Sequence, residues 1–283
     1  TCVHDCAVDC VYLLTCQHSL FFFLMIRRTP RSTLFPYTTL FRSVIRLKNL
    51  SKVYRTAYME TTALDQVNIH IGKGEFVAVM GPSGCGKSTL LNIVGMIDSP
   101  SGGEYWFNGE EVGSRSENEL VDVRKHNIGF IFQNFNLIDD LSVHENVDLP
   151  LLYLGLSRKE RRAKVDEALE LVGLESRAKH KPQELSGGQQ QRVAVARSVV
   201  GDPKLILADE PTGNLDTKNG EDVMNMLRML QQRGVTIIMV THSPQHGERA
   251  DRIISMLDGQ VVAGGQSKLS VVAGNSAFEQ AEG

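Results

Sequence analysis

The sequence predicts an α/β fold built on a parallel sheet, because apolar strand segments alternate with helical segments. Phe76–Met80 is a continuous apolar run of the kind found in strands that are buried on both faces, and Lys204–Ala208 and Val235–Val240 repeat it. Helical patterns are present at Lys87–Ile97 and Glu221–Arg233. Strands that alternate with helices in this way are typical of a parallel sheet.

Other segments predict an antiparallel layer beside this sheet. Val44–Leu50 and Val67–Ile71 alternate apolar and polar residues, as a strand with one buried face does. Glu104–Phe107 and Glu110–Val112 flank Asn108-Gly109, a pair that favours a tight hairpin turn.

The composition is that of an ordinary globular protein. The 283 residues include 30 Lys and Arg, 33 Asp and Glu, a formal net charge of −3 and a hydrophobic share of 42%. These values exclude collagen-like, mucin-like, largely disordered and polytopic membrane proteins. The mild acidity also argues against nonspecific nucleic-acid binding, which shows a basic excess, so no nucleic-acid partner is expected.

A glycine-rich loop separates the strand at Phe76–Met80 from the helix that follows it. The loop fits the pattern G-x-x-x-x-G-K-[ST], in which glycines let backbone N–H groups converge on phosphate oxygens at a helix N-terminus. Lys87 is expected to neutralise the β- and γ-phosphates, and Ser88 to bind Mg²⁺. The nucleotide-binding residues predicted in this loop are Gly81, Ser83, Gly84, Cys85, Gly86, Lys87, Ser88 and Thr89.

A pair of acids ends the apolar strand at Lys204–Ala208. Strand ends with two carboxylates are rare without a cation nearby, so Asp209 is expected to hold the Mg²⁺ shell. Glu210 is expected to polarise the attacking water. The alternative is an ordinary strand cap at the surface.

A second glycine-containing segment, Leu185–Gln189, opens a helix at Gln190–Val199. Ser186 and the glycines at this helix start suit a phosphate group. Taken alone, the segment is explained as well by Ser186 acting as a helix N-cap. The glycine-rich loop and the paired acids flank it in order, which favours the phosphate-binding interpretation.

In this combination the motifs resemble the ATP-binding-cassette ATPases, over roughly Ile45 to Ala263. The resemblance implies a P-loop NTPase fold with a RecA-like parallel-sheet core, an antiparallel β subdomain and a helical signature subdomain. It implies ATP and Mg²⁺ as cofactors and ATP hydrolysis as the activity. The helix predicted over Arg158–Val172, whose charges indicate a solvent-facing side, would belong to the helical part.

The resemblance also implies roles for single residues. Tyr54 matches the aromatic residue that stacks on adenine, and Gln133 matches the glutamine that touches Mg²⁺ and water. Asn214–Asp216 matches a loop that crosses the dimer interface, and His242 matches the switch histidine on the γ-phosphate. Tyr54, Gln133 and His242 each have a simpler alternative, as a packed surface tyrosine, a loop-capping amide and a structural histidine respectively.

Family members of this kind form head-to-tail homodimers, which places each ATP between the phosphate loop of one protomer and a segment of the other. That segment corresponds to Ser186, Gly188 and Gln189. The implied partners are integral membrane permease subunits, contacted through the Gln133–Tyr153 region. The implied location is the cytoplasmic face of the inner or plasma membrane.

Finer features point to one branch of the family. Ala208–Asp216, Gln133–Ile138 and Glu145–Val147 resemble the lipoprotein-releasing, macrolide-export and cell-division ATPases. The expected function is therefore export or release of a lipoprotein, peptide or drug. The alternatives are signalling through a membrane partner to a cell-wall hydrolase and a soluble cassette ATPase that acts on DNA or ribosomes.

The first part of the chain differs from the rest. Met25–Ser43 resembles the conceptual translation of a sequencing-library adapter, which reproduces eighteen of these nineteen residues and departs only at Thr29. We therefore expect residues 1–43 to be a non-native head. The alternatives are a signal peptide, a short membrane anchor and a zinc site among the clustered cysteines.

The expected domains are thus the head at 1–43, an ATPase domain at 44–265 and a flexible tail at 266–283. Within the ATPase domain Cys85 is the only cysteine. Its place at a helix N-terminus beside Lys87 favours a reactive thiolate, and the alternative is a small spacer whose side chain points into the fold.

Overall fold

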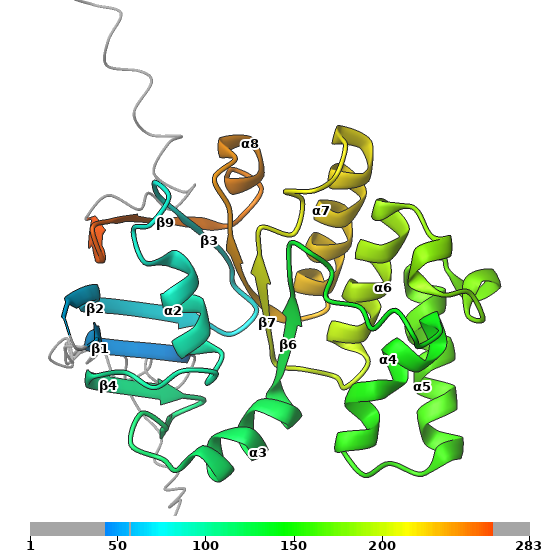
Figure 1. Cartoon of the computed structure of the whole chain (residues 1–283), viewed down its shortest axis with the longest axis horizontal. Helices are drawn as coiled ribbons and strands as arrows, with labels where there is room; N and C mark the ends of the chain where they lie inside the picture. Colours follow the sequence, from blue (N-terminus) through cyan, green and yellow to red (C-terminus); the bar gives the residue numbers. More distant parts are fainter. Residues whose placement is uncertain (1–42, 57, 263–283) are drawn as a thin grey trace, which may run out of the picture. The chain divides into compact units, whose positions relative to one another are not determined.

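The structure is a computed structural model that describes residues 43–56 and 58–262. The expectations for residues 1–42 and for the tail at 266–283 fall outside the described residues. The part that is described contains a smaller antiparallel sheet and a larger, mostly parallel one (Figure 1).

The antiparallel sheet confirms the predicted layer. Its order is β2 (Glu60–Gly72), β1 (Ser43–Arg55), β4 (Gly102–Phe107) and β5 (Glu110–Glu111). At the predicted hairpin, Asn108 has φ 49° and Gly109 φ 85°, the positive values that a tight primed turn requires. On β4, Trp106 faces Arg46 of β1 in the register, and its indole nitrogen donates to Glu104 Oε2 at 3.2 Å.

The larger sheet confirms the predicted parallel core. Its strand order is β10-β9-β3-β8-β7-β6, and all neighbouring pairs are parallel except β9 with β10. The sequence predicts its three central strands, and β6, β9 and β10 are additions from the structure. The bounds are β3 (Phe76–Met80), β6 (Ile128–Ile131), β7 (Leu205–Asp209), β8 (Thr236–Val240), β9 (Arg252–Leu257) and β10 (Gln260–Val262).

The helices follow the predicted segments, with shifted ends. The first helix is shorter than the predicted Lys87–Ile97, because it ends before Gly95 and Met96 turns to φ 57°. The helix predicted from Glu221 starts earlier, because the Asp216 side chain caps it. The bounds are α2 (Lys87–Val94), α3 (Glu117–Asn127), α4 (Val143–Tyr153), α5 (Arg158–Leu171), α6 (Gly187–Val199), α7 (Thr217–Gln232) and α8 (Pro244–Gly247).

Each face of the parallel sheet packs into its own apolar cluster. Alternate residues of β3 divide between the clusters: Val77 and Val79 pack with the antiparallel sheet and α2, and Phe76 and Ala78 pack with α4 to α7. This division explains the continuous apolar runs, because both faces of these strands are buried. Among the residues described, no helix combines the length and apolar character needed to cross a bilayer.

Candidate nucleotide site

The predicted site residues lie where neighbouring parallel strands end. The glycine-rich loop follows β3, His242 follows β8, Asp209 ends β7, and Gln133 follows β6. Since β3, β8, β7 and β6 are adjacent and parallel, these groups share the carboxyl edge of the sheet. Ligands of open α/β sheets bind at this edge.

The loop after β3 has the backbone that a phosphate cradle needs. Gly86 has φ 98°, and a Cβ there would lie 2.4 Å from the Ala63 carbonyl oxygen, so only glycine fits. Lys87 Nζ donates to the carbonyl oxygens of Gly81 at 2.9 Å and Pro82 at 2.7 Å. The loop therefore surrounds its own positive charge, at the N-terminus of α2.

The structure decides between the alternatives for Cys85. Its side chain is 3% exposed and belongs to the apolar cluster under the antiparallel sheet. Its Sγ lies 3.8 Å from Lys87 Nζ. The small-spacer interpretation is therefore supported, and a thiol exposed to reagents is not, because the buried side chain leaves only the backbone of Cys85 to face a phosphate.

Asp209 and Ser88 form the oxygen pair that a Mg²⁺ ion would need. Ser88, in the first turn of α2, acts on Asp209 at the end of β7 so as to favour the charged carboxylate. Burial raises the pKa of Asp209 and the adjacent Glu210 charge raises it further, against the Ser88 hydrogen bond and the Lys87 charge. A hard cation would relieve this excess of negative charge, so the residues fit Mg²⁺.

Glu210 faces His242 from the neighbouring strand end. Their nearest atoms, Glu210 Oε1 and His242 Nδ1, are 3.1 Å apart, and the side chains are 24% and 68% exposed. The Glu210 backbone has φ 45° and its N–H donates to the Val240 carbonyl at 2.9 Å. A left-handed backbone conformation is uncommon for glutamate, and the hydrogen bond to β8 stabilises it at Glu210. The strained backbone therefore sets the direction of the Glu210 carboxylate.

Gln133 contacts the predicted interface loop. Its side-chain nitrogen donates to Asn214 Oδ1 at 3.3 Å, and Asn214 Nδ2 donates back to the Gln133 carbonyl at 3.1 Å. A Cβ at Gly213 would lie 2.8 Å from the same Gln133 nitrogen, so a glycine there makes the approach possible. The structure thus joins Gln133 to the loop after β7, and its role toward Mg²⁺ stays a prediction.

Ser186 is the N-cap of α6, as the simpler of the two predictions for this segment states. Ser186 Oγ accepts from the Gln189 N–H at 3.4 Å, and Gln189 Oε1 accepts from the Ser186 N–H at 3.0 Å. At Gly188 a Cβ would lie 2.2 Å from Asn219 Oδ1, so α6 and α7 meet closely. In Figure 1, α6 and α2 lie on opposite sides of β6 and β7, so one chain keeps this segment apart from the glycine-rich loop.

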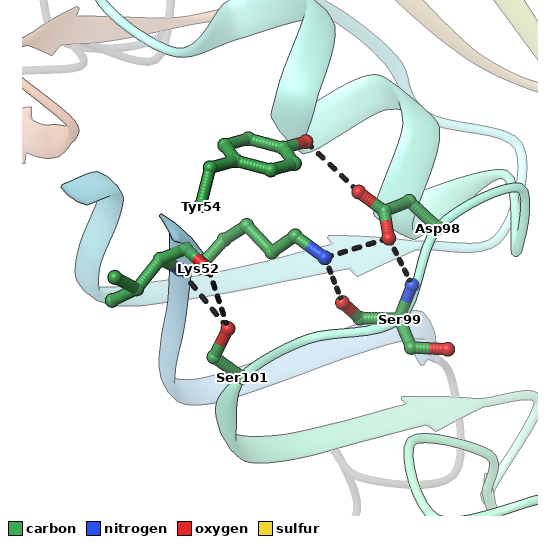
Figure 2. Close-up of polar contacts among 6 residues, drawn as sticks. Lys52, Tyr54, Asp98, Ser99 and Ser101 are labelled. Carbon is green, nitrogen blue, oxygen red and sulfur yellow. Dashed lines mark hydrogen bonds and ion pairs between the residues drawn. The ribbon is translucent and has the colours of Figure 1, made fainter. Parts of the chain in front are cut away.

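Tyr54 lies at the end of β1, and the residue is 42% exposed. Its hydroxyl donates to Asp98 Oδ2 at 2.8 Å, and Lys52 Nζ reaches the other oxygen of that carboxylate at 2.6 Å (Figure 2). Sequence reasoning missed Lys52 and Asp98. The spacing of Lys52 and Tyr54 on one strand was a usable signal, but nothing in the sequence ties Asp98 to either.

Comparisons with known proteins agree with this geometry. The family model described as ABC transporter matches residues 64–213. This chain belongs to the ABC transporter family. The ABC transporter ATP-binding protein YknY of Bacillus subtilis is 46% identical over 228 residues, which cover 81% of this chain and 99% of that protein. The macrolide export ATP-binding/permease protein MacB of Chlorobaculum tepidum is 49% identical over 219 residues, or 77% of this chain and 34% of that protein.

A solved structure of the ATP-binding cassette MJ0796, a dimer bound to ADP and Pi, aligns with a TM-score of 0.73 at 44% identity and covers 79% of this chain and 98% of that one. The predicted fold class is therefore confirmed: this is an ABC ATPase domain with a parallel-sheet core, an antiparallel sheet and a helical part. The chain is an ATP-binding-cassette ATPase.

Proposed function

We propose that this ABC ATPase hydrolyses MgATP as a head-to-tail homodimer. In each composite site the glycine-rich loop of one protomer and the Ser186–Gln189 segment of the other would enclose the nucleotide. The observation that carries the proposal is the separation of α6 from α2 within one chain (Figure 1). The dimeric structure of the similar cassette MJ0796 supports it.

Within each site the chain's own groups divide the work. Glu210 would accept the proton of the attacking water, and His242, held 3.1 Å from that carboxylate, would contact the γ-phosphate. Lys87 would neutralise phosphate charge. Mg²⁺ held by Ser88 and Asp209, with Gln133 as a further predicted ligand, would supply positive charge at the phosphate oxygens. Tyr54 would stack on the adenine.

We further propose that the cycle drives an integral membrane permease at the cytoplasmic face of the membrane, for export or release of a drug, peptide or lipoprotein. The similarity to proteins named as macrolide exporters supports the drug among these candidate substrates. The surface proposed for the permease lies on the loop after β6 and on α4, where Ile138, Leu152 and Tyr153 expose apolar side chains.

The composite site is tested by mixing two inactive variants, Lys87→Ala and Ser186→Arg. A mixed dimer has one site with both lesions and one site with neither. We expect each variant alone to be inactive and the mixture to recover part of the parental hydrolysis rate. Ser186→Arg with normal activity on its own, or a mixture of folded proteins without recovery, would contradict the arrangement.

A further inference from the structure

The hydroxyl of Tyr54 is fastened to the loop that follows α2. It donates to Asp98 Oδ2 at 2.8 Å, while Asp98 Oδ1 accepts from the Ser99 N–H at 2.8 Å (Figure 2). Ser101 Oγ, in the same loop, accepts from the Val53 N–H at 3.0 Å and donates to the Val53 carbonyl at 3.3 Å. Backbone and side chain of this end of β1 are thus both held by one loop.

Lys52 completes the arrangement on the ring itself. Its Nζ donates to Asp98 Oδ1 at 2.6 Å and to the Ser99 carbonyl at 2.7 Å. The same nitrogen lies 4.9 Å from the centroid of the Tyr54 ring. A cation at that distance occupies one ring face and leaves only the opposite face to a nucleobase.

The ionisation of Asp98 agrees with a charged, fully engaged carboxylate. Burial alone would raise its pKa, but hydrogen bonds from Lys52, Tyr54 and Ser99 together hold the pKa below its ordinary value. The acid is therefore ionised at neutral pH, in the state that accepts all three hydrogen bonds.

These contacts tie the ring to the helix that carries the phosphate loop. Asp98 follows the C-terminal end of α2, and its N–H donates to the Asn92 carbonyl at 3.3 Å. Burial and Asp98 raise the pKa of Tyr54, and Thr89, in the first turn of the same helix, acts on that hydroxyl in the opposite direction. The helix that begins with Lys87, the charge expected at the phosphates, and the loop that follows this helix thus hold the ring.

We propose that Asp98 and Lys52 are positioning residues that hold the Tyr54 ring in its base-stacking orientation and thereby set the affinity for the nucleobase end of ATP. The proposal rests on the proposed role of Tyr54 as the adenine platform. An exposed tyrosine that rotates freely loses conformational entropy when a base binds and immobilises it. The Asp98–Lys52 pair already holds the ring, so less entropy is lost on binding. The phosphate end should be unaffected, because neither residue lies in the phosphate loop.

The test compares a ligand that has a base with one that has none. Dissociation constants for MgATP are measured by calorimetry, and inhibition constants for magnesium tripolyphosphate by competition, in the full chain and in Asp98→Ala and Lys52→Met. We expect each variant to bind ATP about tenfold more weakly, with a KM raised to match, an unchanged kcat and unchanged tripolyphosphate inhibition.

The matched control is the Lys48–Glu104 ion pair, which joins β1 and β4 with the same chemistry at 2.9 Å and has no contact with Tyr54 among the described interactions. Lys48→Met and Glu104→Ala should leave ATP binding unchanged. Asp98→Asn, which retains an acceptor oxygen, serves as a second variant where Asp98→Ala lowers the folded yield, and it should weaken ATP binding less.

A Tyr54→Ala background separates positioning from a merely structural role. Without the ring, Asp98→Ala and Lys52→Met should no longer change ATP affinity, since there is nothing left for them to position. ATP affinity unchanged by Asp98→Ala in the Tyr54 chain, an equal effect in the Tyr54→Ala chain, or equally weakened tripolyphosphate inhibition would overturn the inference. Failure of tripolyphosphate to compete with ATP in the parent protein would instead contradict the proposed nucleotide site.

Discussion

Glu210 combines a left-handed backbone, a place at the end of a buried strand and a histidine 3.1 Å away. Glu210→Gln keeps the shape of the side chain and an oxygen that can face His242, but the amide cannot accept a proton. We expect kcat to fall by about 10²–10⁴-fold with little change in ATP affinity, measured by steady-state phosphate release and equilibrium binding.

The control for this variant is Glu221→Gln, which breaks an ion pair with Arg249 and is not one of the predicted site residues. Its kcat should stay near the parental value, because it changes the same functional group without touching the site. Near-parental turnover by a pure Glu210→Gln protein would show that another group serves as the base.

The raised pKa of Asp209 predicts how the free energy of unfolding depends on pH. Its pKa is raised in the folded protein, by burial first and by Glu210 next, so the folded state binds this proton more tightly than the unfolded chain does. The stabilisation that comes from protonated Asp209 is fully present below the ordinary aspartate pKa. It is lost as the pH rises through the raised pKa of the folded state. At neutral pH the ionised group therefore costs stability.

Asp209→Asn removes that cost and keeps an oxygen for the Ser88 hydroxyl. In urea unfolding with a chelator present, the variant should be more stable than the parent at neutral pH by about 1 kcal/mol, with MgATP hydrolysis lost. The difference should shrink on acidification toward about pH 3, where the parental aspartate is largely protonated in both states. A variant that is less stable at neutral pH would disprove this account of Asp209.

At the scale of elements, the close contact of α6 with α7 is sensitive to one added methyl group. Gly188→Ala would place a Cβ 2.2 Å from Asn219 Oδ1, and Asn219 is itself held by Asp216, the cap of α7. We expect a loss of about 1–3 kcal/mol in the free energy of unfolding, measured by urea denaturation.

Gly187→Ala is the neighbouring control, because its Cβ would meet nothing closer than Phe135 at 3.8 Å. Its unfolding free energy should stay within about 0.5 kcal/mol of the parent. Equal stability of both variants would mean that Asn219 moves aside without cost, and that the close approach of α6 and α7 is not required.

The elements that the sequence predicts are those with strong local signals. The strands with continuous apolar runs are confirmed, since an apolar run indicates a strand buried on both faces. The Asn108-Gly109 hairpin is confirmed as well, since this residue pair favours a tight turn. Helices α3 and α4 were missed although Ser116 with Glu119 and Ser142 with Glu145 form capping boxes whose spacing is visible in the sequence. Strand β6 is short and carries a glycine, so it has little local signal at all.

At the scale of the whole molecule, the site could be predicted where one motif contains it. The residues of the glycine-rich loop are contiguous, and so are those of the Asp209–Glu210 pair, so each motif can be recognised from its spacing alone. The pairing of Glu210 with His242, of Gln133 with Asn214 and of Tyr54 with Asp98 depends on strand order and loop packing. Those contacts join distant segments, and only the tertiary structure creates them.

The head at 1–43 remains a proposal that truncation can test. The structure starts β1 at Ser43, which pairs with Gly72, so removal of residues 1–42 keeps that strand complete. We expect the truncated chain to keep its melting temperature and its ATPase activity, because an adapter-derived segment would have had no selection to pack against the domain. A large fall in melting temperature would contradict an adapter origin.

Trp106 is an intrinsic fluorescent probe at a defined position in the structure. It is the only tryptophan of the chain, and it lies on β4 of the antiparallel sheet, next to the strand that ends in the Tyr54 platform. Tryptophan-selective fluorescence therefore reports on the antiparallel sheet alone. If nucleotide binding changes the emission of Trp106, the environment of this residue in the antiparallel sheet has changed. The emission would then measure nucleotide occupancy without an added label.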